Sequence, residues 1–128
     1  MARVKGIGGI FFKTRNLEAQ KKWYEKHLGL DCGEEGCVVF KWRQEEDPER
    51  SGSTVWSPFP ADTQYFSPGT ASFMINYRVD NLRKVLDQLR KEGVQVDDKI
   101  EESEFGKFGW IQDPEGNRIE LWEPPEGM

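Results

Sequence analysis

The sequence repeats itself once. Ile10–Leu17 is similar to Ile75–Leu82, which lies 65 positions further along, and Thr54–Pro58 is similar to Glu120–Pro124 at an offset of 66. Both offsets are close to half of the 128-residue chain. When two separate stretches repeat at almost the same offset, the pattern is typical of a duplicated unit. We therefore expect two copies of one structural motif.

Each copy begins with a strand-like run that leads into a helical pattern. In residues 73–79 every second side chain is apolar, as in a strand with two different faces. Asn81 is a favourable N-cap, apolar residues then recur at helical spacing, and Gly93 supplies a stop. In the first copy Asn16 and Gly29 hold the corresponding positions. These patterns predict one strand and one helix at the start of each copy.

Short strand-like runs follow each predicted helix, at residues 37–43, 53–57, 106–112 and 117–123. The last two are separated by Asp113-Pro114-Glu115-Gly116, which has Asp, Pro and Gly where a type I turn prefers them and so predicts a hairpin. Each copy thus contains a strand, a helix and about three further strands. We expect a single domain, with module one at about 1–62 and module two at about 70–125.

The composition narrows the possible partners. Acidic residues outnumber basic residues by 23 to 18, the net charge is −5, and no basic stretch is dense enough to follow a phosphate backbone, which argues against nucleic acid. Cys32 and Cys37 form neither a disulfide framework nor a zinc site. The apolar run at residues 6–12 is too short for a membrane span. We expect a soluble, cytoplasmic protein without a membrane partner.

Several stretches carry a resemblance to a known family. The specific part is residues 113–117, Asp-Pro-Glu-Gly-Asn, followed by Ile119-Glu120-Leu121, and Trp23-Tyr24 and Leu28-Gly29-Leu30 match as patterns. With them the chain resembles the vicinal oxygen chelate superfamily of glyoxalases, bleomycin- and fosfomycin-resistance proteins and extradiol dioxygenases. The resemblance implies an α+β fold of two tandem βαβββ modules whose mixed sheet curls into a cup. It leaves the reaction open, because this fold hosts lyases, dioxygenases, transferases and non-enzymatic binders.

Metal-dependent members of this family hold a divalent ion with side chains from the first and last strands of the modules. The resemblance places these positions at Gly9, Thr54, Met74 and Glu120, and only Glu120 is a usual ligand for such an ion. The one histidine, His27, lies near the end of the first predicted helix. We predict no metal site and no cofactor, and leave open one exception, a divalent metal held through Glu120.

Glu120 is the predicted catalytic residue. Alternation along the last strand puts it on the face of Arg118 and Trp122, opposite the residues that pack under the helix. In that position the carboxylate would act as a general base, anchor a substrate amine or hydroxyl, or pair with a cation. The alternative is a structural salt bridge with Arg78 or Lys13, which alternation sends to the same face.

Further side chains are predicted to line the cup and bind the ligand. Trp56, Trp122 and Phe11 share one side and offer an apolar surface for a planar ligand. Asn76, at mid-strand, would be unfavourable to bury without a partner. Alternatively, the aromatic residues fill the cup or a subunit contact, and Asn76 is a satisfied buried amide. The full predicted set is Phe11, Thr54, Trp56, Asn76, Arg78 and Trp122.

Three functions remain open at this point. The leading one is binding of a small organic molecule in the cup without the usual metal, as in resistance-type members that protect by sequestering their ligand. The second is a lyase or isomerase of the glyoxalase type that uses Glu120 as acid/base or as metal ligand. The third is a structural module whose filled cup is only an interface. The resemblance also implies a homodimer.

Overall fold

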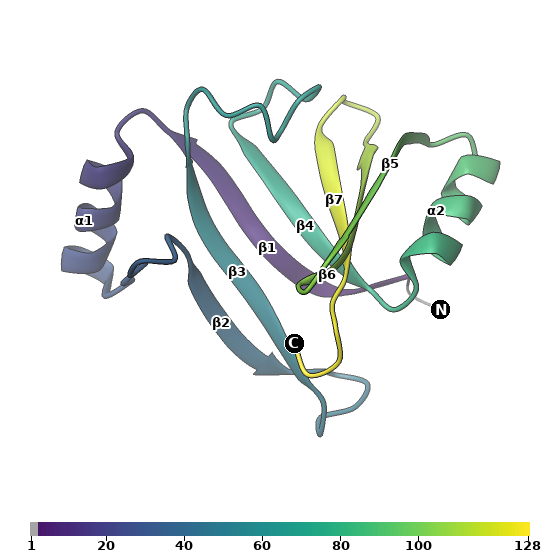
Figure 1. The fold of residues 1–128 in the computed structure, drawn as a ribbon, viewed down its shortest axis with the longest axis horizontal. Coiled ribbons are helices and arrows are strands. Elements are labelled where there is room, and N and C mark those ends of the chain that lie inside the picture. The colour runs from purple at the N-terminus through teal and green to yellow at the C-terminus, as the bar shows by residue number, and fades with distance from the viewer. Residues whose placement is uncertain (1–2) are drawn as a thin grey trace.

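Seven strands form one mixed sheet that does not close on itself (Figure 1). The structure is a computed structural model and describes residues 3–128. Across the sheet the strands follow the order β2-β3-β1-β4-β7-β6-β5. The elements are β1 (Val4–Thr14), α1 (Leu17–Leu28), β2 (Val38–Arg43), β3 (Ser51–Pro60), β4 (Phe73–Val79), α2 (Leu82–Lys91), β5 (Gln95–Ser103), β6 (Gly106–Gln112) and β7 (Arg118–Glu123).

The two copies meet at the middle of the sheet. Their first strands, β1 and β4, pair antiparallel, and in each copy the last strand lies parallel to the first, β3 on β1 and β7 on β4. The predicted α+β fold is confirmed. The first copy has one strand fewer than the predicted βαβββ unit, because residues 29–37 contain turns and no strand. Gly33 and Gly36 have positive φ angles of 57° and 77° in this stretch, which is not extended backbone.

The local signals for helices and turns are present in the structure. Asn16 and Asn81 cap α1 and α2, since each side chain accepts a backbone N–H three residues further on, at 3.0 Å and 3.1 Å. The predicted hairpin joins β6 to β7, and the Gly116 N–H donates to the Asp113 carbonyl at 3.0 Å. These elements arise from residues that are close together in the sequence.

The two helices are bound to the sheet to different extents. α2 buries Leu82 and Leu86 completely against Val79 and Leu121, whereas α1 buries no residue. α1 contacts the sheet through the ring of Tyr24, which packs against Phe12 and Trp56. Within residues 3–128, neither helix is long and apolar enough to cross a membrane.

The face of the sheet opposite the helices, called the inner face from now on, carries a second core. Its buried members are Phe11, Met74 and Trp110 from the sheet, and Phe66. Phe66 belongs to residues 61–72, which join β3 to β4 (teal in Figure 1). The connection between the two copies therefore covers part of the inner face, where the sequence had predicted a cup.

Candidate functional site

Three neighbouring strands bring polar and aromatic side chains to one point of the inner face. In the parallel pairing of β4 with β7, Asn76 lies opposite Glu120. In the antiparallel pairing of β6 with β7, Trp110 lies opposite the same residue. Paired residues of adjacent strands project from the same face. The register therefore places an amide and an indole on either side of the Glu120 carboxylate.

Glu120 accepts three hydrogen bonds and is 1% exposed. Asn76 Nδ2 donates to Oε1 at 2.6 Å, Trp110 Nε1 donates to Oε2 at 2.9 Å, and the Tyr65 hydroxyl also donates to Oε2. Burial raises the pKa of Glu120, although these hydrogen bonds and Arg118 act in the opposite direction. Burial and the adjacent carboxylate also raise the pKa of Tyr65, which keeps its proton. We call these four residues the Glu120 cluster.

The salt bridge considered as an alternative for Glu120 is not formed. The Lys13 ammonium lies over the Phe66 ring, 5.6 Å from its centroid. The Arg78 guanidinium donates to backbone oxygens at the far end of the inner face. Glu120 is thus a buried carboxylate satisfied by neutral donors, with Arg118 as the nearby positive charge.

The residues around Glu120 do not fit a divalent cation. Such an ion needs several lone pairs turned towards one point, whereas the three groups nearest to this carboxylate present N–H or O–H. At the other family positions, Met74 is a buried thioether, and a side chain on Gly9 would meet the Phe11 ring at 2.6 Å. In the described part of the chain, no three His, Cys, Asp or Glu residues are grouped to hold a metal.

Sequence reasoning missed Tyr65. The residue lies in a segment interpreted only as a linker, yet its hydroxyl binds Glu120 and its ring stacks on Phe59 at a centroid distance of 5.7 Å. The neighbouring Phe66 is buried in the inner-face core. Two consecutive aromatic residues in a polar connection were the available signal, because such side chains are seldom left in solvent together.

The prediction that Trp56 lines the cup is wrong. Its ring contacts Phe12 and Tyr24, at centroid distances of 5.2 Å and 4.8 Å, on the α1 side of the sheet. The Thr54 hydroxyl is also occupied by hydrogen bonds within the protein: it accepts from the Trp42 indole at 2.9 Å and donates to a backbone carbonyl of β1. Neither Trp56 nor Thr54 is therefore available on the inner face to bind a ligand.

The strand register explains the position of Trp56. Ile10 of β1 pairs with Trp56, and its counterpart Ile75 of β4 pairs with Ile119. The sequence repeat had matched Trp56 to Trp122. In the strand register Trp56 instead corresponds to Ile119, which lies three positions before Trp122. Successive side chains of a strand alternate between faces, so an odd shift moves a side chain to the opposite face.

The remaining predicted residues lie on the inner face. Phe11 is buried and packs edge-on against Phe59 at 5.5 Å. Trp122 stacks on Phe108 at 6.0 Å, and its Nε1 donates to the Phe105 carbonyl at 2.7 Å. The structure therefore brings together Glu120, Asn76, Arg78, Trp122 and Phe11 on one face and excludes Trp56.

Arg78 lies two residues beyond Asn76 on β4 and is 5% exposed. Its guanidinium is placed between two indoles, with the ring centroids of Trp42 and Trp122 at 5.3 Å and 5.2 Å from Cζ. Nη1 donates to the main-chain oxygens of Met128 at 3.0 Å and Ser53 at 3.5 Å. Burial lowers the pKa of Arg78.

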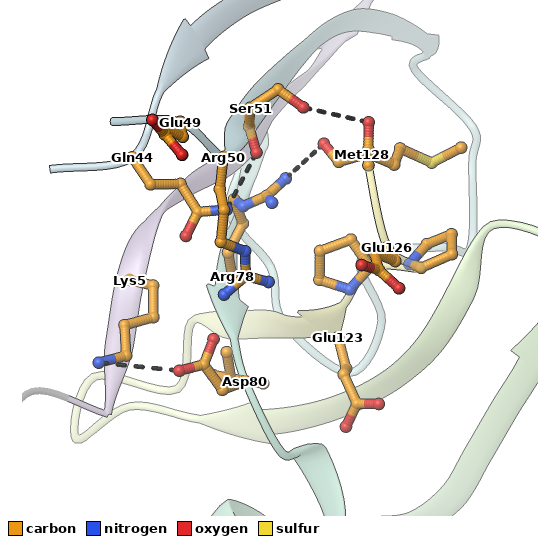
Figure 2. Close-up of a pocket in the computed structure, with 14 residues that line it drawn as sticks. Lys5, Gln44, Glu49, Arg50, Ser51, Arg78, Asp80, Glu123, Glu126 and Met128 are labelled. Atoms are coloured by element: carbon orange, nitrogen blue, oxygen red, sulfur yellow. Dashed lines mark hydrogen bonds and ion pairs between the residues drawn. The ribbon is translucent and has the colours of Figure 1, made fainter. Parts of the chain in front are cut away.

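Arg78 also lines a cavity of about 460 Å³, called the Arg78 cavity below (Figure 2). The start of β1, residues 44 and 49–51, the end of β4 and the tail at residues 123–128 enclose it. Arg78 is the one predicted site residue in its wall. A second cavity of about 270 Å³ lies beside Arg118 and Trp110. The charged residues around the Arg78 cavity are Lys5, Glu49, Arg50, Arg78, Asp80, Glu123 and Glu126.

A comparison with protein families finds a match over most of the chain. The family model described as Glyoxalase/Bleomycin resistance protein/Dioxygenase superfamily matches residues 6–121. No curated protein matches the sequence.

Solved structures show the same fold. Methylmalonyl-CoA epimerase from Mycobacterium tuberculosis is 18% identical with a TM-score of 0.59, over 98% of this chain and 91% of that one. A Streptomyces coelicolor methylmalonyl-CoA epimerase variant in complex with 2-nitronate-propionyl-CoA is 16% identical with a TM-score of 0.69, over 97% of each chain. A superfamily member from Vibrio splendidus 12B01 is 8% identical with a TM-score of 0.56, over 91% and 97%. At these identities the likeness extends to the fold alone.

Proposed function

This chain belongs to the glyoxalase/bleomycin resistance protein/dioxygenase superfamily, and we propose that it binds a small organic molecule without a catalytic metal. The observation that carries the proposal is the Arg78 cavity. Its volume of about 460 Å³ lies within the range of small-molecule sites, and its charged wall offers the polar groups that orient a ligand. A protein that sequesters its ligand needs no catalytic machinery, so such a cavity is sufficient for a resistance-type role.

The proposed site is displaced from the one expected from the sequence. Around Glu120 the inner face is filled by Tyr65, Phe66 and Trp110. A ligand there would have to displace the Tyr65 hydroxyl from a buried carboxylate, which is unfavourable unless the ligand replaces that hydrogen bond. The Arg78 cavity needs no such displacement, because the space exists in the structure.

Structures with the same fold support a small-molecule role. The Streptomyces coelicolor epimerase has been solved with 2-nitronate-propionyl-CoA, and a methylmalonyl-CoA epimerase with methylmalonyl-CoA and NH4+. Those ligands belong to those proteins. For this chain they support the general proposal that the sheet carries a small organic ligand.

An isomerase or lyase of the glyoxalase type is the second candidate. The observation that favours it is a buried carboxylate, Glu120, whose pKa is raised by burial, a feature common among proton-transferring groups. In this candidate Glu120 is the acid/base, and Tyr65 must move aside for the substrate. The leading proposal requires no movement of the Glu120 cluster.

Native mass spectrometry of protein purified without chelator tests the leading proposal, because it reports bound small molecule, bound metal and subunit count together. We expect one organic molecule per chain and no stoichiometric metal, and we propose a homodimer. An NMR titration with the released molecule should shift signals of Arg78 and residues 124–128. Shifts confined to Tyr65 and Trp110 would refute the cavity as the site.

Proton exchange distinguishes the second candidate. Carbonyl compounds with an acidic α-proton are incubated with the protein in D2O, and loss of the α-proton signal is followed by NMR. The leading proposal expects no exchange above buffer. Exchange that is lost in Glu120→Gln and kept in Glu45→Gln, an exposed loop carboxylate, would instead establish Glu120 as the acid/base.

A further inference from the structure

The Arg78 cavity contains two guanidinium groups, and two of its four acidic residues, Asp80 and Glu123, are engaged elsewhere. Asp80 lies 3.8 Å from the Lys5 ammonium, and Glu123 accepts the backbone N–H at the start of α2 at 2.8 Å. Among residues 3–128, neither Arg78 nor Arg50 forms an ion pair with a side-chain carboxylate. Buried positive charge is normally paired. A negatively charged ligand would therefore complement these two guanidinium groups.

Arg78 presents free donors in a fixed orientation. Nη1 is bound to main-chain oxygens, while Nε and Nη2 make no hydrogen bond to the described residues and are not sealed from solvent. The guanidinium carbon also lies over the indoles of Trp42 and Trp122, 5.3 Å and 5.2 Å from their ring centroids, within the range of cation–π contacts. A guanidinium fixed in this way matches the two oxygens of a carboxylate.

Arg50 adds a second positive charge beside the first. Its exposed side chain lies next to Arg78 in the cavity (Figure 2), and its charge lowers the pKa of Arg78. Two cations held this close repel each other. An anion placed between them would relieve that repulsion and bind both groups.

The rim of the cavity carries the opposite charge. Glu49 and Glu126 line it and are exposed. They would repel a second negative group on the same ligand. A phosphate monoester, which carries a charge of about −1.5 to −2 at neutral pH, is for the same reason a poorer match than a carboxylate.

We propose that the Arg78 cavity is a monocarboxylate site, in which Arg78 and Arg50 bind the carboxylate and the rest of the ligand is neutral or positively charged. This inference rests on the proposed function and narrows it to one class of ligand. Arg78 contributes the fixed fork, and Arg50 contributes an exposed second charge.

Matched aromatic probes test the inference. Phenylacetate, phenylacetamide, 1,4-phenylenediacetate and phenyl phosphate are titrated into the protein at constant ionic strength and neutral pH, and backbone NMR shifts give each Kd. We expect phenylacetate to shift signals of Arg78 and residues 124–128 and to bind about tenfold more tightly than each of the other three. Equal or tighter binding of the amide, the dicarboxylate or the phosphate would overturn the inference.

Two variants connect the affinity to the arginines. Arg50→Gln should weaken phenylacetate binding about fivefold, and Arg78→Lys, which keeps the charge and loses the fork, about tenfold. The control is Arg15→Gln, an exposed arginine just after β1, at the opposite end of that strand from Lys5, which should change nothing. Because Arg78 is buried, melting temperatures are compared first. If Arg78→Lys does not fold, Arg50→Gln decides the test, and unchanged affinity in that variant refutes the inference.

The results separate this inference from the proposed function. A neutral or cationic molecule that binds in the Arg78 cavity would keep the proposed function and overturn the monocarboxylate assignment. Absence of binding by every probe and by every molecule in native mass spectrometry would overturn both. Phenylacetate binding that persists in both arginine variants would place the carboxylate elsewhere and refute the assignment alone.

Discussion

Glu120 is a buried carboxylate without an ion-pair partner, and hydrogen bonds from neutral groups stabilise it inside the protein. Three neutral donors, from Tyr65, Asn76 and Trp110, are aimed at its two oxygens. They offset part of the unfavourable transfer of the charge out of water. Burial in the protein still raises the pKa of Glu120, so the folded state binds the proton more tightly than the unfolded state does.

That direction predicts how stability depends on pH. A carboxyl whose folded pKa is raised contributes stability below its unfolded pKa, near 4.5, and this contribution is lost as the pH rises towards the folded value. Between these values the unfolding free energy should fall by at most about 1.4 kcal/mol per pH unit from this group. Glu120→Gln should remove this part of the slope, and Glu45→Gln should not. Urea unfolding of the three proteins from pH 5 upwards measures it, and parallel profiles would contradict the prediction.

Tyr65→Phe tests the hydrogen bond from the other side. A bond to a charged acceptor contributes about 1.5–3 kcal/mol, so this variant should lose about that much unfolding free energy. In the Glu120→Gln background the loss should shrink to about 1 kcal/mol, because the acceptor is neutral. Chemical denaturation of the single and double variants gives the coupling. Tyr77→Phe, whose hydroxyl makes no side-chain hydrogen bond in residues 3–128, is the control, and equal losses in both backgrounds would refute the coupling.

At the scale of elements, the two helices differ although they come from equivalent positions of a repeat. Leu82 and Leu86 of α2 are fully buried against the sheet, but α1 buries none of its residues and contacts the sheet through Tyr24. The first copy also lacks the strand that follows the helix in the second copy. With less apolar area removed from water, α1 gains less from packing.

Hydrogen exchange should show this difference. We expect the amides of α1 to open with a free energy at least about 1 kcal/mol lower than those of α2, because local opening of α1 exposes little apolar surface. Exchange measured by mass spectrometry on peptides from 17–28 and 82–91 provides the comparison. Leu86→Ala should speed exchange in α2 and leave α1 unchanged. Equal protection of the two helices in the unaltered protein would contradict this account.

At the scale of the whole molecule, the inner face is divided between two covering segments. Residues 61–72 close it over the Glu120 cluster through Tyr65 and Phe66. The tail reaches the other end, where the Met128 oxygen accepts from Arg78 and from Ser53 Oγ at 2.9 Å. The duplicated sheet thus presents a closed region over the Glu120 cluster and the Arg78 cavity at the other end of the inner face.

The same arrangement predicts the response to metals. Titration of Mn2+ or Zn2+ by calorimetry should show no stoichiometric binding at micromolar affinity. The groups around Glu120 are hydrogen-bond donors, and the other positions that hold the metal in the family, Gly9, Thr54 and Met74, are not usual ligands for such an ion. Weak binding through His27 would survive Glu120→Ala. Tight binding that Glu120→Ala abolishes would refute the metal-free proposal and bring the enzyme candidate to first place.

Much of the fold could be predicted from the sequence because its signals are local. Asn16 and Asn81 act on backbone groups three residues away, and the turn at Asp113–Gly116 is closed by its own residues. The alternation in β4 and β7 correctly placed Asn76 and Glu120 on one face, since strand geometry imposes a period of two. The duplicated pattern was sufficient to predict the fold class.

What the sequence by itself determined was therefore the duplicated plan, both helices, most of the strands, and the faces of the strands near the centre of the sheet. Only the tertiary structure decided the register of β3 on β1, which sends Trp56 to the α1 side. It also decided one of the three hydrogen bonds to Glu120, which the Tyr65 hydroxyl donates across a separation of 55 residues. Register and long-range contacts depend on how the whole sheet packs. A shift by an odd number of residues reverses the face of every side chain in a strand, and no local pattern excludes it.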